Sequence, residues 1–156
     1  ELAQLDEMTG LLTKTATRRH IEHLLKEKPD QLYAFFILDI DTFKQANDLY
    51  GHAFGDSVIE QFAAVLRTQF REQDMIGRIG GDEFLVLCLG IEEKDLREHV
   101  EKLRMDMKEH QVTMAVGMIW KERGPKDIDL LLNESERLMY EDKDRYYKEH
   151  GLKRRR

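Results

Sequence analysis

The feature of this sequence that most constrains its fold is an uninterrupted apolar run over 32–38, which ends at Asp39-Ile40-Asp41. A strand with one face in water alternates apolar and polar residues, whereas a strand that is apolar at every position is covered on both faces. A membrane-spanning helix needs about 20 apolar residues, and this run is much shorter. We therefore expect a central strand that carries acidic residues at its carboxyl end.

The remaining apolar patterns predict four helices and three further strands. Helices are expected over about 15–28, 56–70 and 127–147 and across Leu96, Val100, Leu103 and Met107; strands are expected near 75–79, 83–89 and 112–120. Gly80-Gly81 lies between two of these strands and predicts a tight hairpin turn with positive φ at glycine, which a Cβ at either position would obstruct. The order α-β-α-β-β-α-β-α contains a βαββαβ unit, so we expect an α+β fold, a ferredoxin-like palm domain with additional flanking helices. Nucleotide polymerases and cyclases share this architecture, but a fold alone does not establish function.

Composition and charge narrow the possible classes of protein. The 156 residues fit one domain, and 41% hydrophobic with 36% charged residues describes a folded chain with well-hydrated helices. The net charge of −6 disfavours nucleic acid as a partner. Cys88 is the single cysteine, so an internal disulfide and a cysteine-rich zinc site are excluded. The sequence begins with Glu1 in place of Met and shows no signal peptide, so we expect a cytoplasmic domain cut from a longer protein. The full-length protein could be membrane-anchored through its missing N-terminal part. Residues 151–156 are expected to form a basic C-terminal tail.

Two acidic clusters are the strongest candidates for a functional site. Asp39 and Asp41 follow the central strand, and Asp82 and Glu83 follow the glycine turn. In a βαββαβ sheet the first strand lies beside the hairpin, so the two clusters should face each other at one edge. Gathered carboxylates repel and need a hard cation with oxygen ligands, Mg²⁺ above all when phosphates are present. Either pair alone is commonly a solvated turn, but the two pairs together with Gly-Gly favour a metal site.

The segment after the central strand offers groups for a nucleotide. Backbone N–H groups of 43–47 and the Lys44 ammonium could bind phosphates. Asn47 and Asp56 supply an amide and a carboxylate, and a carboxylate can accept hydrogen bonds from guanine N1–H and its exocyclic amine together. Adenine lacks this pair of donors, so these residues favour guanine.

The same residues resemble a known family. Gly80-Gly81-Asp82-Glu83-Phe84 is the signature of the GGDEF domain, the catalytic domain of diguanylate cyclases. The resemblance continues in the family's order over most of the chain. Asp6-Glu7-Met8-Thr9-Gly10-Leu11 is similar to D-x-L-T-G-L; the segment from Asp39 to Asp56 is similar to D-x-D-x-F-K-x-x-N-D-x-x-G-H-x-x-G-D; 113–117 is similar to T-V-S-I-G; and Met139-Tyr140-Glu141-Asp142-Lys143 is similar to L-Y-x-A-K.

The resemblance implies an enzyme that condenses two GTP molecules into cyclic di-GMP and releases two pyrophosphates, with Mg²⁺ or Mn²⁺. It implies metal ligands at Asp39, Ile40 (through its carbonyl oxygen), Asp82 and Glu83, and catalytic roles for Glu83, Asp82 and Lys44, with Glu83 activating the 3′-hydroxyl. It implies substrate contacts from Phe43, Asn47, His52, Asp56, Gly80, Gly81 and Lys143. Each domain would hold one GTP, so catalysis would need a homodimer. Residues 1–5 would end an upstream linker or signalling helix, residues 6–150 would form the catalytic domain, and a sensory domain would lie upstream.

The resemblance also implies a second site, and the chain differs from the family's pattern in two places. Arg71-Glu72-Gln73-Asp74 has the spacing of the family's R-x-x-D inhibitory site, at which cyclic di-GMP binds. Thr13-Lys14 stand where the family often has N-R, which could weaken a salt bridge of the N-terminal turn. After Lys143 the helix continues in place of a Gly-Arg-Asn ending, so Arg145 is only a candidate for assisting the phosphates.

Two alternatives to the active cyclase remain open. A GGDEF domain can act as a regulatory module that binds GTP or cyclic di-GMP without turnover, but such domains usually lose signature acids or the guanine-reading pair, and this chain keeps both. A cyclase making cyclic AMP or a mixed dinucleotide is disfavoured by Asp56, because adenine presents an acceptor at N1.

Overall fold

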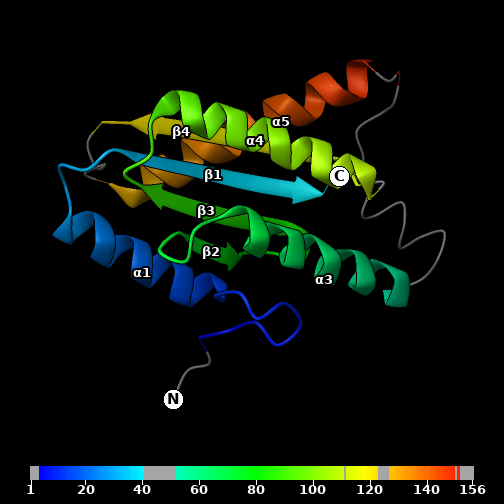
Figure 1. Cartoon of the computed structure of the whole chain (residues 1–156), viewed down its shortest axis with the longest axis horizontal. Helices are drawn as coiled ribbons and strands as arrows, with labels where there is room; N and C mark the ends of the chain where they lie inside the picture. The colour runs from blue at the N-terminus through cyan, green and yellow to red at the C-terminus, as the bar shows by residue number, and fades with distance from the viewer. Residues whose placement is uncertain (1–3, 41–51, 111, 123–126, 150, 152–156) are drawn as a thin grey trace.

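The computed structural model describes residues 4–40, 52–110, 112–122, 127–149 and 151, without the side chains of 52–54. Its elements follow one another in the predicted order (Figure 1). They are α1 (Lys14–Glu27), β1 (Tyr33–Ile40), α3 (His52–Gln69), β2 (Met75–Arg78), β3 (Glu83–Leu89), α4 (Glu93–Glu109), β4 (Met114–Lys121) and α5 (Ile128–Glu149). In the part of the chain that the structure describes, no helix is long and apolar enough to span a membrane.

The strands form one antiparallel sheet in the order β2-β3-β1-β4. β1 therefore lies between two neighbours, and all eight of its residues are buried. This confirms the central strand predicted from the apolar run. The structure also extends that strand by two residues, through Asp39 and Ile40, so the first acid belongs to the strand itself.

Helices cover both faces of the sheet. On one face, Ala34, Phe36 and Leu38 of β1 pack with apolar residues of α3 and α4, and on the other face Phe35 and Ile37 pack with α1 and α5. The helices of the βαββαβ unit, α3 and α4, share one face, as the ferredoxin-like prediction requires. The helices α1 and α5 are the predicted flanking elements, and they seal the opposite face.

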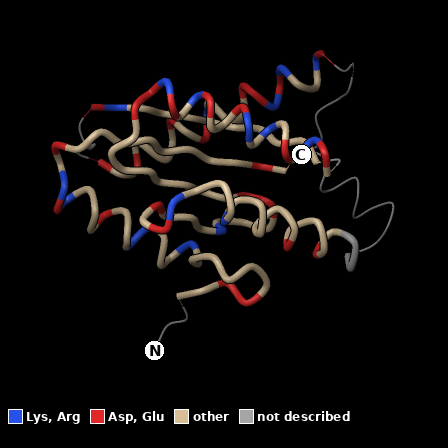
Figure 2. Tube along the Cα trace, viewed as in Figure 1, with Lys and Arg blue, Asp and Glu red and all other residues tan. Residues whose placement is uncertain are grey.

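Acidic and basic residues alternate along the outer surfaces of α4 and α5 (Figure 2). Ion pairs four residues apart include Arg97–Glu93, Lys94–Glu98 and Arg137–Glu141. Pairs of this kind are exposed and add only a few tenths of a kcal/mol each. They account for the high charged content as solvated helix surface.

Two local predictions about glycine were wrong. The second helix was expected to begin near residue 56, after Gly55, but α3 begins at His52 and Gly55 is buried inside it. Positive φ was expected at Gly80-Gly81, but the described glycines with positive φ are Gly10, Gly90 and Gly151. The turn is wider than a two-residue hairpin, because the Glu83 carbonyl oxygen accepts hydrogen bonds from the backbone N–H groups of both Ile79 and Gly80. A wider turn needs no left-handed residue at its tip.

Space around the two signature glycines also differs from expectation. A Cβ added at Gly81 would meet nothing within 4 Å, and one at Gly80 would approach Glu83 Cβ at 3.4 Å. The expectation that a Cβ at either position would obstruct the turn was therefore wrong, since Gly81 faces open space and a Cβ at Gly80 would make only an ordinary contact. The open space beside Gly81 instead leaves room for a molecule to approach the backbone of the turn.

Candidate active site

The register of the sheet brings the two acidic clusters together. Asp39 of β1 is the direct cross-strand partner of Glu83 of β3, and Asp82 precedes Glu83 in the turn. Carboxylate oxygens of Asp39, Asp82 and Glu83 lie within 4.8 Å of one another. The Ile40 backbone N–H donates to the Asp82 carbonyl oxygen at 3.2 Å, which ties the end of β1 to the turn. The expectation that the clusters face each other is confirmed for Asp39, Asp82 and Glu83, whereas Asp41 lies outside the described residues.

Asp39 is the most constrained of the three acids. It is 4% exposed, and its Oδ2 accepts a hydrogen bond from Lys143 Nζ of α5 at 2.9 Å. Its Oδ1 is buried and has no hydrogen-bond partner among the described residues. Burial raises the pKa of Asp39 to about 7; the hydrogen bond from Lys143 opposes this effect, and the nearby Asp82 carboxylate adds to it.

Glu83 is held in a similar environment. Burial raises its pKa above the ordinary glutamate value, and the charges of Asp82 and Glu136 add to that effect. Lys143 and Lys14 act in the opposite direction. Asp39 and Glu83 are thus both held toward their neutral forms, mainly by burial and further by the charge of the neighbouring Asp82.

The donor set fits a divalent cation. Among the described residues, the buried Asp39 Oδ1 has none of the hydrogen bonds that usually accompany a buried carboxylate. Three carboxylates in one place are the oxygen ligands that Mg²⁺ and Mn²⁺ prefer. A cation here would satisfy the unpartnered oxygen and would relieve the repulsion between the acids.

Arg78 braces the turn that carries two of these acids. Its Nε and Nη2 donate to the Gly81 carbonyl oxygen at 3.2 and 2.9 Å, and its Nη1 reaches Asp6 Oδ2 at 3.2 Å. The Asp6 side chain in turn accepts hydrogen bonds from the backbone and hydroxyl of Thr9. The N-terminal turn is thus joined to the end of β2 by the salt bridge between Asp6 and Arg78, which does not involve Thr13 or Lys14. The motif spacing alone did not predict that Arg78 would bind both the Gly81 carbonyl oxygen and Asp6.

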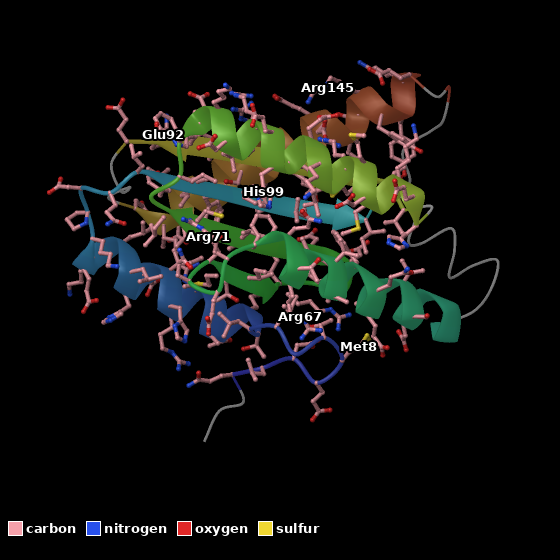
Figure 3. The ribbon with its side chains drawn as sticks, viewed as in Figure 1. Met8, Arg67, Arg71, Glu92, His99 and Arg145 are labelled. Atoms are coloured by element: carbon pink, nitrogen blue, oxygen red, sulfur yellow. The ribbon has the colours of Figure 1, made fainter. Side chains whose placement is uncertain are left out.

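The other predicted site residues fall into three groups. Asp56 is exposed on the first half of α3, while Gly80 and Gly81 form the turn beside the acids. Phe43, Lys44 and Asn47 and the side chain of His52 lie outside the described residues. Arg145 lies on the solvent side of α5 (Figure 3), where its Nη2 pairs with Asp142 Oδ1 at 3.1 Å. Lys143, and not Arg145, is the α5 cation that contacts the acidic cluster.

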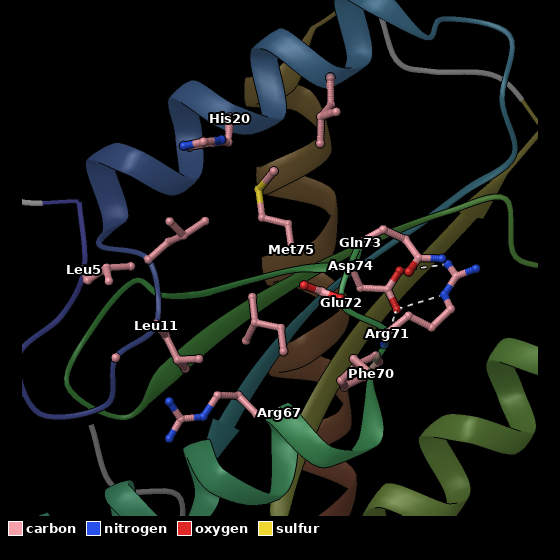
Figure 4. Close-up of a pocket in the computed structure, with 14 residues that line it drawn as sticks. Leu5, Leu11, His20, Arg67, Phe70, Arg71, Glu72, Gln73, Asp74 and Met75 are labelled. Carbon is pink, nitrogen blue, oxygen red and sulfur yellow. Dashed lines mark hydrogen bonds and ion pairs between the residues drawn. The ribbon is translucent and has the colours of Figure 1, made fainter.

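The R-x-x-D segment forms a compact ion pair at the other end of the sheet. Arg71 Nε and Nη2 donate to the two carboxylate oxygens of Asp74 at 3.1 and 2.8 Å. A third hydrogen bond joins Arg71 Nη2 to the Leu89 carbonyl oxygen at 2.8 Å. Both residues line a pocket of about 610 Å³ between the N-terminal turn, α1 and the end of α3 (Figure 4). Arg67 lines the same pocket one helical turn before Arg71.

Comparison with known proteins places this geometry in a family. The profile described as "Diguanylate cyclase, GGDEF domain" matches residues 3–148. The chain belongs to the GGDEF family. It is 30% identical over 155 residues to the bifunctional diguanylate cyclase/cyclic di-GMP phosphodiesterase MucR of Pseudomonas aeruginosa, covering 92% of this chain and 22% of MucR. It is 26% identical over 151 residues to the cyclic di-GMP phosphodiesterase PdeR of Escherichia coli, covering 92% of this chain and 23% of PdeR.

A solved structure of the same fold supports the architecture. The GGDEF domain of DgcB from Caulobacter crescentus, in complex with c-di-GMP, superimposes with a TM-score of 0.80 at 20% identity, over 99% of this chain and 95% of that one. This GGDEF domain spans less than a quarter of the length of MucR and PdeR. At this identity the likeness to DgcB shows the fold alone. The acidic cluster is a feature of this chain's own geometry.

The acidic cluster predicts a Mg²⁺ affinity that depends on Asp39 and on pH. We expect Asp39→Asn to weaken Mg²⁺ binding at pH 8 by about tenfold or more, because the substitution removes the charge of a buried ligand. In the unaltered domain the affinity should rise between pH 6 and pH 8, since Asp39, with a pKa of about 7, must lose its proton to bind a cation. Isothermal titration calorimetry measures both effects.

The matched control is Asp129→Asn, which removes an exposed acid of α5 that pairs with Arg18. It should leave Mg²⁺ affinity unchanged. Equal Mg²⁺ affinity in the Asp39→Asn and unaltered proteins would remove Asp39 from the metal site.

Proposed function

We propose that this GGDEF domain is the catalytic half-site of a diguanylate cyclase, which condenses two GTP into cyclic di-GMP with Mg²⁺ as the cofactor. The observation that carries the proposal is the cluster of Asp39, Asp82 and Glu83, with an unpartnered buried oxygen, beside an open glycine turn. Family membership supports the reaction class. The individual roles are those that the family resemblance implies, and the geometry of the cluster supports those of Asp39, Asp82 and Glu83.

In the proposed reaction, Asp39, Asp82 and Glu83 hold the cation, together with the Ile40 carbonyl oxygen. Bound Mg²⁺ would supply charge neutralisation for the triphosphate and acidify the attacking hydroxyl. The Glu83 carboxylate accepts the proton of the 3′-hydroxyl. The 3′-oxygen forms a bond to the α-phosphorus of the opposing GTP while the bond from that phosphorus to the pyrophosphate oxygen breaks. The raised pKa of Glu83 makes its carboxylate a stronger base than an exposed glutamate.

Cations and guanine-reading groups complete the proposed site. Lys143, held at Asp39 in the metal-free protein, would neutralise the triphosphate together with Lys44 once a cation takes over the charge of Asp39. Asn47 and Asp56 would read the guanine edge, and Phe43, His52, Gly80 and Gly81 would line the space around the nucleotide. Each domain presents one set of these groups, so two domains must face each other as a homodimer.

The proposed boundaries are those that the family resemblance implies. Residues 6–150 would form the catalytic domain, flanked by the end of a linker or signalling helix and by a basic tail. A sensory domain elsewhere in a longer protein would bring two copies together, in keeping with the greater length of MucR and PdeR.

The proposed reaction is tested by incubating the domain at high concentration with GTP and Mg²⁺ and analysing nucleotides by chromatography and mass spectrometry. We expect cyclic di-GMP and pyrophosphate to form. Asp82→Asn should lower the rate by at least about a hundredfold, because a charged metal ligand is lost. Asp95→Asn, an exposed acid on α4, is the control and should keep full activity. Full activity in Asp82→Asn would contradict the metal assignment.

We also propose that cyclic di-GMP inhibits the enzyme by binding at Arg71 and Asp74. The Asp74 side chain is 3% exposed and orients the Arg71 guanidinium through two hydrogen bonds. A guanidinium held in this way presents its remaining donors in a fixed direction, which suits a phosphate or a guanine edge.

This site predicts that Arg71→Ala relieves product inhibition. We expect the concentration of cyclic di-GMP that halves the initial rate to rise about tenfold or more, since a charge-assisted contact is worth about 1.5–3 kcal/mol. The initial rate without product should stay close to that of the unaltered protein. Arg97→Ala, an exposed arginine of α4, is the matched control. An unchanged inhibition curve in Arg71→Ala would dismiss the site.

The alternative function is a regulatory module that binds GTP or cyclic di-GMP without turnover. A phosphodiesterase such as PdeR contains a region similar to this chain, so a GGDEF sequence alone does not establish synthesis. The presence of all three acids in one cluster favours the enzyme. Nucleotide binding without any Mg²⁺-dependent product would favour the module.

A further inference from the structure

Asp142, the residue before Lys143 on α5, binds the outer edge of β4. Its Oδ2 accepts hydrogen bonds from the Val116 backbone N–H and from Arg104 Nη2, both at 2.8 Å. Arg104 also donates through Nη1 to the Met114 carbonyl oxygen at 3.0 Å. Because β4 is at an edge of the sheet, its outward backbone groups have no strand beside them. The Arg104–Asp142 pair takes the place of that missing strand.

This contact lies at the level of the acidic cluster. Met114 and Val116 flank Ala115, and Ala115 is the cross-strand partner of Asp39 on β1. Asp142 therefore holds α5 to the sheet at the position where Lys143, one residue later, reaches Asp39. The two consecutive side chains bind opposite sides of β4, one at its outer edge and one across it on the central strand.

A second contact sets the distance between α5 and β4. A Cβ at Gly117 would lie 1.8 Å from the Ser135 carbonyl oxygen and 2.5 Å from the Met139 backbone nitrogen. Only glycine allows this approach. Backbone contact through a glycine fixes the separation of a helix and a strand. The directional hydrogen bonds of Asp142 add a second tie between α5 and β4, close to Lys143.

We propose that Asp142 is a positioning residue for Lys143: by anchoring α5 to β4 and Arg104, it fixes the Lys143 ammonium beside the acidic cluster. The effect of Asp142 on catalysis rests on the proposed function. The positioning of Lys143 by Asp142 does not depend on it. Arg145 adds little, because it is an exposed partner of the same carboxylate. The L-Y-x-A-K pattern has alanine at the position of Asp142, and alanine favours helix, so Asp142→Ala is suited to the test.

The first test needs no nucleotide. Brief acylation of the folded domain with N-hydroxysuccinimide acetate, followed by peptide mass spectrometry, gives a relative rate for each lysine. The Lys143 side chain is 13% exposed and should react slowly, whereas Lys94, at 84%, should react fast. We expect Asp142→Ala to raise the Lys143 rate about tenfold, the size of a typical coupling between neighbours. The Lys94 rate should not change.

Two further variants sharpen this test. Asp142→Asn keeps an acceptor for the Val116 N–H and should restore part of the protection of Lys143. Arg145→Ala removes only the exposed partner of Asp142 and should leave the Lys143 rate as it is. An unchanged Lys143 rate in Asp142→Ala would overturn the proposal.

The second test is a double-mutant cycle on nucleotide affinity. The probe is α,β-methylene GTP with Mg²⁺, which cannot release pyrophosphate. We expect Asp142→Ala to weaken binding about tenfold in the unaltered background and less than about twofold in Lys143→Met, because the residue through which Asp142 acts is then absent. Equal weakening in both backgrounds would indicate a general structural role and overturn the proposal. If the analogue does not bind while Lys143 acylation still depends on Asp142, the positioning stands and the proposed function fails.

Discussion

The contact between Asp39 and Lys143 joins the centre of the sheet to its last helix. Asp39 is buried at the end of the central strand, where a charged carboxylate is costly unless it is paired. Lys143 supplies the pairing to one oxygen only, and the other oxygen stays without a partner among the described residues. The protein thus keeps an acid in a place that favours its neutral form. Such a cost is typical of functional sites, where local stability is given up for binding.

The rest of the fold maintains this arrangement. The antiparallel register sets Glu83 opposite Asp39, and Arg78 braces the turn that carries Asp82. From the other side, α5 lies against β4 through Gly117 and is anchored by Asp142. The acids are therefore positioned by strands, and their counter-ion is positioned by a helix. A cation held by the acids would take over the charge that Lys143 balances at Asp39, without having to move the strands.

Sequence patterns predicted the parts of this site that depend on topology. The apolar run over 32–38 indicated a central strand, and the βαββαβ order placed Asp39 beside the turn of Asp82 and Glu83. The part played by Lys143 came from resemblance to a family, because nothing in its local pattern distinguishes it from other helix lysines. Its contact with Asp39 joins residues that are far apart in sequence, and only the packing of α5 on the sheet reveals it.

Other features could not be predicted because they depend on packing details. The contacts of Asp142 and Arg104 require the register of α5 against an edge strand, which no periodicity encodes. The Gly80-Gly81 pair suggested a tight turn with positive φ. The turn is instead a wide one closed by the Glu83 carbonyl oxygen, and it needs no positive φ at either glycine. Gly55 lies inside α3, which begins at His52, although glycine has a weak helix propensity. Its burial in the helix could not be read from the sequence pattern.

The pH dependence of stability tests most directly whether the acidic cluster awaits a cation. A carboxyl group with a folded-state pKa above its unfolded value stabilises the fold at low pH, and that contribution is lost as pH rises through the folded pKa, here about 7 for Asp39. Urea denaturation of the metal-free domain should therefore show the free energy of unfolding falling by roughly 1–3 kcal/mol between pH 5 and pH 8. The fall should be smaller in Asp39→Asn, and saturating Mg²⁺ should restore stability at pH 8 in the unaltered domain only. The same slope in both proteins, with no effect of Mg²⁺ on either, would contradict the account.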